Sequence, residues 1–85
     1  MSDDRLEMKL QEFISYRIGH GDSVSTAERR TRRIKTISKN IDVWKVDTGS
    51  IFKYVEERLR KGIKKKSLRI ELMDLQRWYE FLGYN

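Results

Sequence analysis

Apolar residues recur along this chain at intervals of three and four, the spacing of one face of an α-helix. The clearest case is the segment 65–82, whose stripe consists of Leu68, Leu72, Leu75, Tyr79 and Leu82. No segment sustains the alternation of apolar and polar residues that is typical of a strand, and there is no proline. The pattern therefore predicts an all-α protein with a helix over residues 65–82.

Two more helices are predicted in the first half of the chain. Residues 4–18 carry a helical stripe and end at a glycine-containing turn. Residues 25–41 open with Ser25-Thr26-Ala27-Glu28, which is a capping-box pattern, and Ser23 is the alternative cap. The two stripes consist of Leu6, Leu10, Phe13, Ile14 and Ile18, and of Ala27, Ile34, Ile37 and Ile41.

A third stretch, residues 48–61, follows a capping Asp47 or Thr48 and ends at a glycine. Its apolar stripe consists of Ile51, Val55 and Leu59, with Phe52 and Tyr54 beside it. The connector before it contains Trp44, and an aromatic residue between helices is more often part of the core than a base-stacking platform. Together the segments predict a four-helix domain.

Length and composition set limits on function. Eighty-five residues suffice for one domain with a modest core, but not for a large buried active site. Without cysteine there is no disulfide framework and no thiolate chemistry. The polar, acidic N-terminus does not resemble a signal peptide, and no apolar run reaches membrane-spanning length. We expect a cytoplasmic or nucleoid-associated protein that takes no cofactor and no small-molecule substrate.

Positive charge is concentrated in two segments of this chain, whose formal net charge is +6. Residues 26–39 carry six lysines or arginines against one glutamate, and residues 58–69 carry seven without any acid. Such segments are typical of a protein that meets a polyanion. Nucleic acid is the first candidate partner. An anionic membrane is disfavoured, because the basic helices need their apolar stripes for the core.

The basic face of the 25–41 helix lies opposite its apolar stripe and carries Arg29, Arg32, Arg33, Thr36 and Lys39. Arg30 falls at the margin of the stripe, so we expect its methylenes on the core and its guanidinium in water. Lys64, Lys65, Lys66 and Arg69 make the start of the last helix basic. Cations there are mildly unfavourable for the helix itself, and an external anion would explain them.

Catalytic and metal-binding roles are not predicted. The single histidine, His20, lies in a turn without cysteine or other ligands nearby in the sequence, so we interpret it as an exposed loop residue. The tyrosines, at positions 16, 54, 79 and 84, are interpreted as core or surface residues, because a tyrosine nucleophile needs convergent cations and a base.

The sequence resembles the N-terminal SAM-like, core-binding domain of the tyrosine recombinases of the phage-integrase type. The resemblance covers most of the chain. It rests on Ser23-Val24-Ser25-Thr26 at the start of the second helix, on Ile51 to Leu59 in the third, and on the last helix region. That region comprises Gly62-Ile63-Lys64-Lys65-Lys66-Ser67-Leu68, followed by Leu75, Trp78, Tyr79, Phe81 and Leu82.

The resemblance implies a four-helix SAM-like bundle that holds double-stranded DNA with its second and last helices. It implies no strand cleavage by this chain, because the family's catalytic residues belong to a separate domain, and it leaves room for contacts with other protomers. Ile70, Glu71 and Asp74 lie on or beside the outer face of the last helix, so we expect only its first turn to contact DNA. The residues expected at the DNA are Ser23, Thr26, Arg29, Arg32, Arg33, Thr36, Lys64, Lys65, Lys66, Ser67 and Arg77.

Two alternatives remain open. One is a domain that docks against a protein partner, its basic faces being solvated. The other is a stand-alone small DNA-binding regulator, which would dimerise to read a longer site. The exposed apolar residues expected to serve such a dimer are Ile70, Met73 and Phe81.

Overall fold

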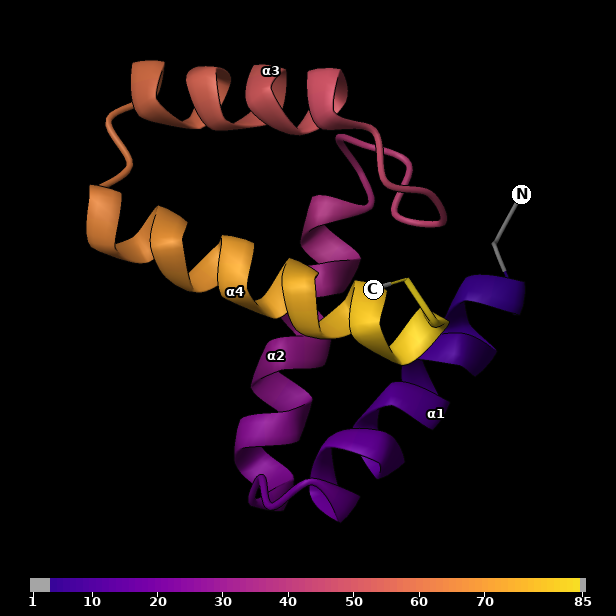
Figure 1. Ribbon diagram of the computed structural model, residues 1–85. Coiled ribbons are helices and arrows are strands. Elements are labelled where there is room, and N and C mark those ends of the chain that lie inside the picture. Colours follow the sequence, from indigo (N-terminus) through magenta and orange to yellow (C-terminus); the bar gives the residue numbers. More distant parts are fainter. Residues whose placement is uncertain (1–3, 85) are drawn as a thin grey trace.

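The computed structural model describes residues 4–84. Within them the chain forms four α-helices and no strand: α1 (Asp4–Gly19), α2 (Val24–Ile37), α3 (Thr48–Arg60) and α4 (Lys65–Leu82). In Figure 1, α1 and α2 form a V-shaped hairpin, α4 crosses α2 and ends beside α1, and α3 folds back over the first half of α4. The all-α, four-helix prediction is confirmed. No helix in the described part of the chain combines the length and apolarity needed to cross a membrane.

The core is built around Trp78 of α4, whose side chain is completely buried. Its indole meets the ring of Phe13 edge-on, with 5.3 Å between ring centroids, and its Nε1 donates a hydrogen bond of 2.8 Å to the carbonyl of Val43. The indole N–H is therefore satisfied inside the core, as a buried tryptophan requires. The other buried members of this cluster are Leu10, Ile34, Ile37, Tyr54, Leu75 and Tyr79.

The apolar stripe predicted for α3 is wrong in detail. Tyr54 is the residue that this helix buries, whereas Leu59 is 41% exposed and Phe52 is 68% exposed. The reason is that α3 packs on α4 through the Tyr54 ring, whose hydroxyl bonds to Glu71. Phe81 was also expected to be exposed, but it is half-buried against Phe13.

Both predicted ends of the second helix are corrected by the structure. α2 begins at Val24 because Ser23, not Ser25, is the N-cap: its Oγ accepts a 3.2 Å hydrogen bond from the Thr26 amide. The helix ends at Ile37 instead of residue 41. Hydroxyl and amide side chains just after Ile37 bond back to the last carbonyls, Ser38 to Lys35 and Asn40 to Thr36, and favour a turn over another helical turn.

Replacing Ser23 with alanine should lower the free energy of unfolding by about 1 kcal/mol, because the Thr26 amide loses its acceptor. Ser25→Ala is the matched control, since Ser25 is exposed and is not the cap, and it should change the free energy by a few tenths of a kcal/mol at most. The change in the free energy of unfolding is measured for both variants by urea unfolding, from the shift of the midpoint at an unchanged m-value. A larger effect at Ser25 would restore the original capping-box prediction.

The connector between α2 and α3 is held by aromatic side chains of the C-terminal region. Besides the bond from Trp78, the Tyr79 hydroxyl donates to the carbonyl of Lys45 at 2.9 Å, and the Tyr84 hydroxyl donates to the carbonyl of Trp44 at 2.8 Å. The half-buried Trp44 ring packs edge-on against Trp78. The connector therefore closes one end of the core, as its apolar residues predict.

Candidate nucleic-acid interface

A groove of about 360 Å³ lies where α2, the end of α3 and the start of α4 meet. Four of the side chains that line it are arginines, three from α2 and one from α3. We call it the arginine groove; it is lined by Arg29, Arg32, Arg33, Thr36, Ile37, Arg58, Ser67, Ile70 and Glu71. Five of the predicted DNA contacts are thus brought together from two helices: Arg29, Arg32, Arg33, Thr36 and Ser67.

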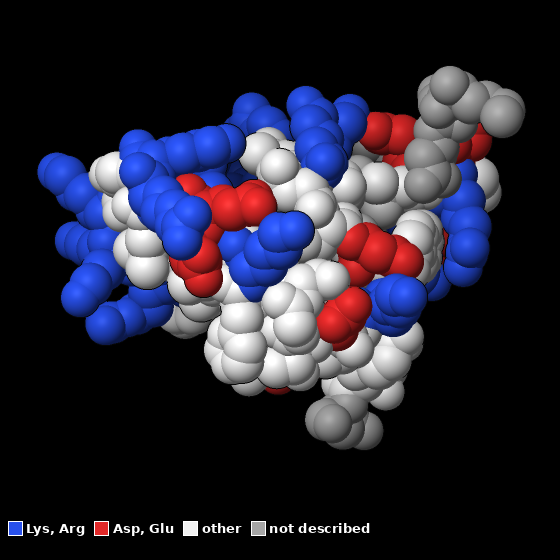
Figure 2. Space-filling view, turned by 90° about the horizontal axis from the view of Figure 1, so that it is seen from above, with Lys and Arg blue, Asp and Glu red and all other residues white. Residues whose placement is uncertain are grey.

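Beside the groove, α4 begins with three exposed lysines, Lys64, Lys65 and Lys66, which we call the lysine rim. Figure 2 shows lysine and arginine side chains crowded at the end of the molecule where α3 ends and α4 begins. No side chain caps α4, and its first turn holds no acid. The positive end of this helix is therefore not neutralised by its own first turn.

The arginines of the groove form two pairs. Arg29 and Arg32 are exposed and form no ion pair with any residue in the range 4–84. Arg33 and Arg58 are half-buried, and each is tied to a carboxylate of α4. The groove therefore combines two exposed arginines without an ion pair in this range with two arginines that carboxylates hold in place.

Asp74 is the carboxylate that fixes Arg33, and the structure corrects its expected place on the outer face of the last helix. It is completely buried and accepts hydrogen bonds of 2.7 Å from Arg33 and 2.5 Å from Arg30. Figure 1 shows that α4 crosses α2, and Asp74 faces Arg30 and Arg33 of α2 at this crossing instead of water. Burial of this carboxylate is tolerable because two guanidinium groups compensate it.

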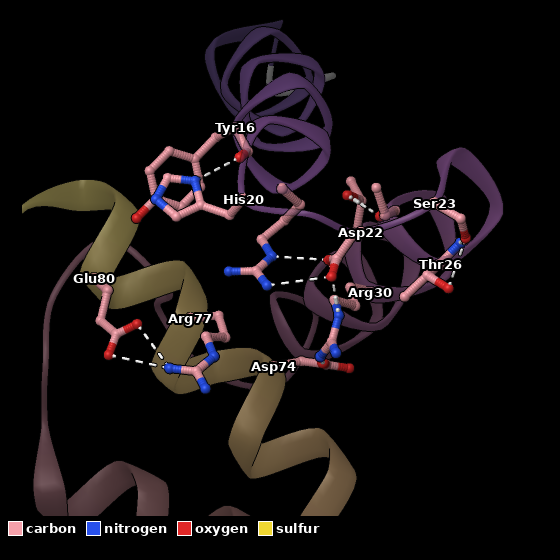
Figure 3. Close-up of polar contacts among 12 residues, drawn as sticks. Tyr16, His20, Asp22, Ser23, Thr26, Arg30, Asp74, Arg77 and Glu80 are labelled. Carbon is pink, nitrogen blue, oxygen red and sulfur yellow. Dashed lines mark hydrogen bonds and ion pairs between the residues drawn. The ribbon is translucent and has the colours of Figure 1, made fainter.

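Arg30 was expected to hold its guanidinium in water, and this is also wrong. Its Nε lies 3.1 Å from the carboxylate of Asp22, so Arg30 bridges Asp22 and Asp74 (Figure 3). Asp22 in turn accepts a 2.9 Å hydrogen bond from Arg17, and this bond is the main reason why the pKa of Asp22 is lowered. The resulting ionic network joins α1, the α1–α2 turn, α2 and α4 through Arg17, Asp22, Arg30, Asp74 and Arg33.

Glu71, the carboxylate that fixes Arg58, was likewise expected on the outer face, where it would repel phosphate. It is half-buried and accepts 2.5 Å and 2.9 Å hydrogen bonds from the Tyr54 hydroxyl and from Arg58. Burial and this bond raise the pKa of Tyr54, which stays protonated as the donor. The charge of Glu71 is therefore matched locally by Arg58. Arg58 itself was missed as a site residue because it lies on a helix that the sequence did not connect to this surface.

Three predicted site residues, Ser23, Thr26 and Arg77, belong neither to the arginine groove nor to the lysine rim. Ser23 and Thr26 form the α2 cap and bond to each other at 2.9 Å. Arg77 lies further along α4, where it pairs with Glu80 at 3.1 Å (Figure 3). His20, in the turn after α1, packs its ring at a tilt against Tyr16, with 4.2 Å between ring centroids. The structure thus separates Arg77 from the other predicted contacts.

Comparisons with models of protein families, with curated proteins and with solved structures find no match to this chain. The function is therefore inferred from the surface itself. The arginine groove and the lysine rim supply guanidinium and ammonium donors together with the Ser67 hydroxyl. The carboxylate in the groove lining, Glu71, is paired with Arg58. Such a surface suits the binding of a polyanion.

Proposed function

We propose that this chain is a DNA-binding module of the kind with which tyrosine recombinases hold a recombination site. The observation that carries the proposal is the arginine groove between α2 and α4, with the lysine rim beside it. Both helices that the resemblance assigns to DNA contribute to this one basic surface. Cleavage of DNA strands belongs, in this proposal, to a separate catalytic domain.

Phosphate neutralisation supplies most of the affinity in this mechanism. Arg29, Arg32 and the lysine rim are exposed. Their charges can therefore replace the cations condensed on the DNA, which are released when the duplex binds. Guanidinium groups also form bidentate hydrogen bonds to phosphate oxygens, which fixes the orientation of the duplex. An arginine that enters the major groove reads a guanine edge.

Three of the four tyrosines support a binding role without cleavage. The hydroxyls of Tyr54, Tyr79 and Tyr84 each donate a hydrogen bond within the domain, to Glu71, to the Lys45 carbonyl and to the Trp44 carbonyl. The pKa of Tyr79 is raised, chiefly by burial, which opposes the phenolate that a nucleophile requires.

An amide-resolved titration with a short duplex tests the proposal. At low salt, shifts should cluster at the arginine groove and the lysine rim, and at about 0.2 M salt they should collapse because counterion release drives binding. If these amides stay still at low salt while the protein is folded, the proposal is wrong. A salt-insensitive interaction of the same surface with a protein would favour a docking domain instead.

The logarithm of the DNA association constant falls with the logarithm of the salt concentration. Replacing Arg32 with alanine should make this slope less steep by about one, because one phosphate contact is lost. The same result is expected for Arg29→Ala and for Lys66→Ala. Lys35→Ala is the matched control on α2: it removes the same charge from a side chain that pairs with Glu7 of α1 at 2.7 Å and lies outside the groove. Arg77→Ala should likewise leave the slope unchanged. Equal losses at all these positions would indicate attraction by net charge alone.

A further inference from the structure

Within the arginine groove we propose a discrete seat for one tetrahedral phosphate group, formed by Arg29, Arg32, Arg58 and Ser67. The seat includes α3, which the proposed function does not require. The same chemistry serves a backbone phosphodiester and a free phosphate ion. For the backbone form, the inference rests on the proposed DNA-binding function.

The first support is that part of the groove is fixed before any ligand arrives. Nη2 of Arg58 donates to Glu71 at 2.9 Å and Nη1 of Arg33 donates to Asp74 at 2.7 Å. Each guanidinium carries five N–H donors, so these bonds hold the planes in place and leave further donors. A positive wall that is already ordered costs less conformational entropy on binding than free side chains do.

The second support is the pair of arginines in the same groove that have no ion-pair partner in the part of the chain that the structure describes. Arg29 and Arg32 are three residues apart on α2 and therefore lie on the same face of the helix, and both line the groove. Neither has an ion-pair partner among residues 4–84. Their side chains are free to close over an anion that reaches the fixed wall.

The third support comes from the start of α4. Ser67 is the third residue of that helix, it lines the groove, and its hydroxyl makes no hydrogen bond within the described part of the chain. Amides of a first turn are free donors, and no acid or side-chain cap competes for them here. The Ser67 hydroxyl is therefore an uncommitted donor in the same groove as the arginines.

The groove also restricts what can bind. Glu71 in its wall is paired with Arg58, so the charge that remains comes from the arginines. Ile37 and Ile70 give it an apolar lining that strengthens charge interactions. A multiply charged oxyanion is therefore favoured over chloride, and a cation is excluded.

A titration with inorganic phosphate, with chloride holding ionic strength constant, tests the seat directly. Amide shifts should saturate and should be confined to Arg29 to Ile37, Arg58 and Ser67 to Glu71. Arg32→Ala should raise the dissociation constant for phosphate about tenfold and Ser67→Ala should raise it about fivefold. Lys35→Ala should change it less than about twofold. Shifts that spread over all lysines without saturation, or equal effects of Arg32→Ala and Lys35→Ala, would overturn the seat.

Because Arg58 also holds Glu71, its role in phosphate binding is tested by Arg58→Lys. This variant keeps the positive charge but loses the paired N–H donors of the planar guanidinium. We expect weaker phosphate binding with an unchanged unfolding midpoint. Arg60→Lys is the control, since Arg60 is on the same helix, is highly exposed and lies outside the groove. Unchanged phosphate affinity in Arg58→Lys would remove α3 from the seat and so overturn its proposed composition.

A second arm uses a short duplex and separates this inference from the proposed function. Phosphate should displace the bound duplex better than chloride at equal ionic strength. If the duplex binds at the groove but phosphate does not saturate, the seat is wrong and the DNA-binding proposal stands. If phosphate saturates and the duplex does not bind, the seat stands for free phosphate and the DNA-binding proposal is wrong.

Discussion

Replacing Asp74 with alanine should lower the free energy of unfolding by about 3–5 kcal/mol. The completely buried carboxylate accepts hydrogen bonds from Arg30 and Arg33. Its removal leaves Arg33 without a counter-charge and leaves Arg30 with Asp22 as its remaining partner. The loss reflects this uncompensated positive charge more than any net gain that the pairs contribute. Urea unfolding followed by circular dichroism measures it.

Glu80→Ala is the matched control for Asp74→Ala, because Glu80 is a carboxylate of the same helix that pairs with an arginine at the surface. Its loss should cost at most about 1 kcal/mol. If Asp74→Ala were no more destabilising than Glu80→Ala, the buried ionic network would not hold α4 against α2. A further readout is phosphate or duplex binding by folded Asp74→Asn, which should weaken because Arg33 loses its anchor.

Trp78→Ala should be about as destabilising, with a loss of about 3–5 kcal/mol. The side chain is completely buried and contacts the rings of Phe13, Trp44 and Phe81, so truncation leaves a large cavity where α1, α4 and the connector meet. For a domain of this size, that is a large part of the total stability. The remaining tryptophan, Trp44, still reports unfolding by its fluorescence.

Trp78→Phe separates the hydrogen bond from the volume. It keeps much of the apolar contact but leaves the Val43 carbonyl without its donor, so we expect a loss of about 1–3 kcal/mol. Phe52→Ala serves as the control, since this aromatic residue is 68% exposed, and its effect should stay within about 0.5 kcal/mol. A comparable loss at Phe52 would show that the core is not centred on Trp78.

Much of the fold could be predicted because its signals are local. The periodicity of α4 together with the basic turn before it gave both ends of that helix, and Asp47 identified the start of α3. The end of α2 could not be found in the same way. Ile41 continues the helical spacing, no glycine or proline interrupts it, and the turn depends on Ser38 and Asn40 bonding to the backbone.

The candidate site was predicted less completely because its geometry depends on contacts between distant segments. Arg29 and Arg32 were found from their place opposite the apolar stripe of α2. Asp74, in contrast, sits 44 residues from Arg30 and 41 from Arg33, and no local pattern shows that α4 crosses α2 there. The groove position of Arg58 likewise follows only from how α3 folds over α4.

The bonds that fasten the α2–α3 connector have a consequence for which of its positions can vary. Trp78, Tyr79 and Tyr84 all donate to main-chain carbonyls, which every amino acid carries, and not to side chains of the connector. An exposed position such as Lys45 can therefore change in size or charge without releasing the loop, whereas the Asp42 side chain accepts a 2.9 Å hydrogen bond from the Trp44 amide. The constraint lies with the three aromatic donors and with Asp42, and the freedom to vary lies with the other exposed positions of the connector.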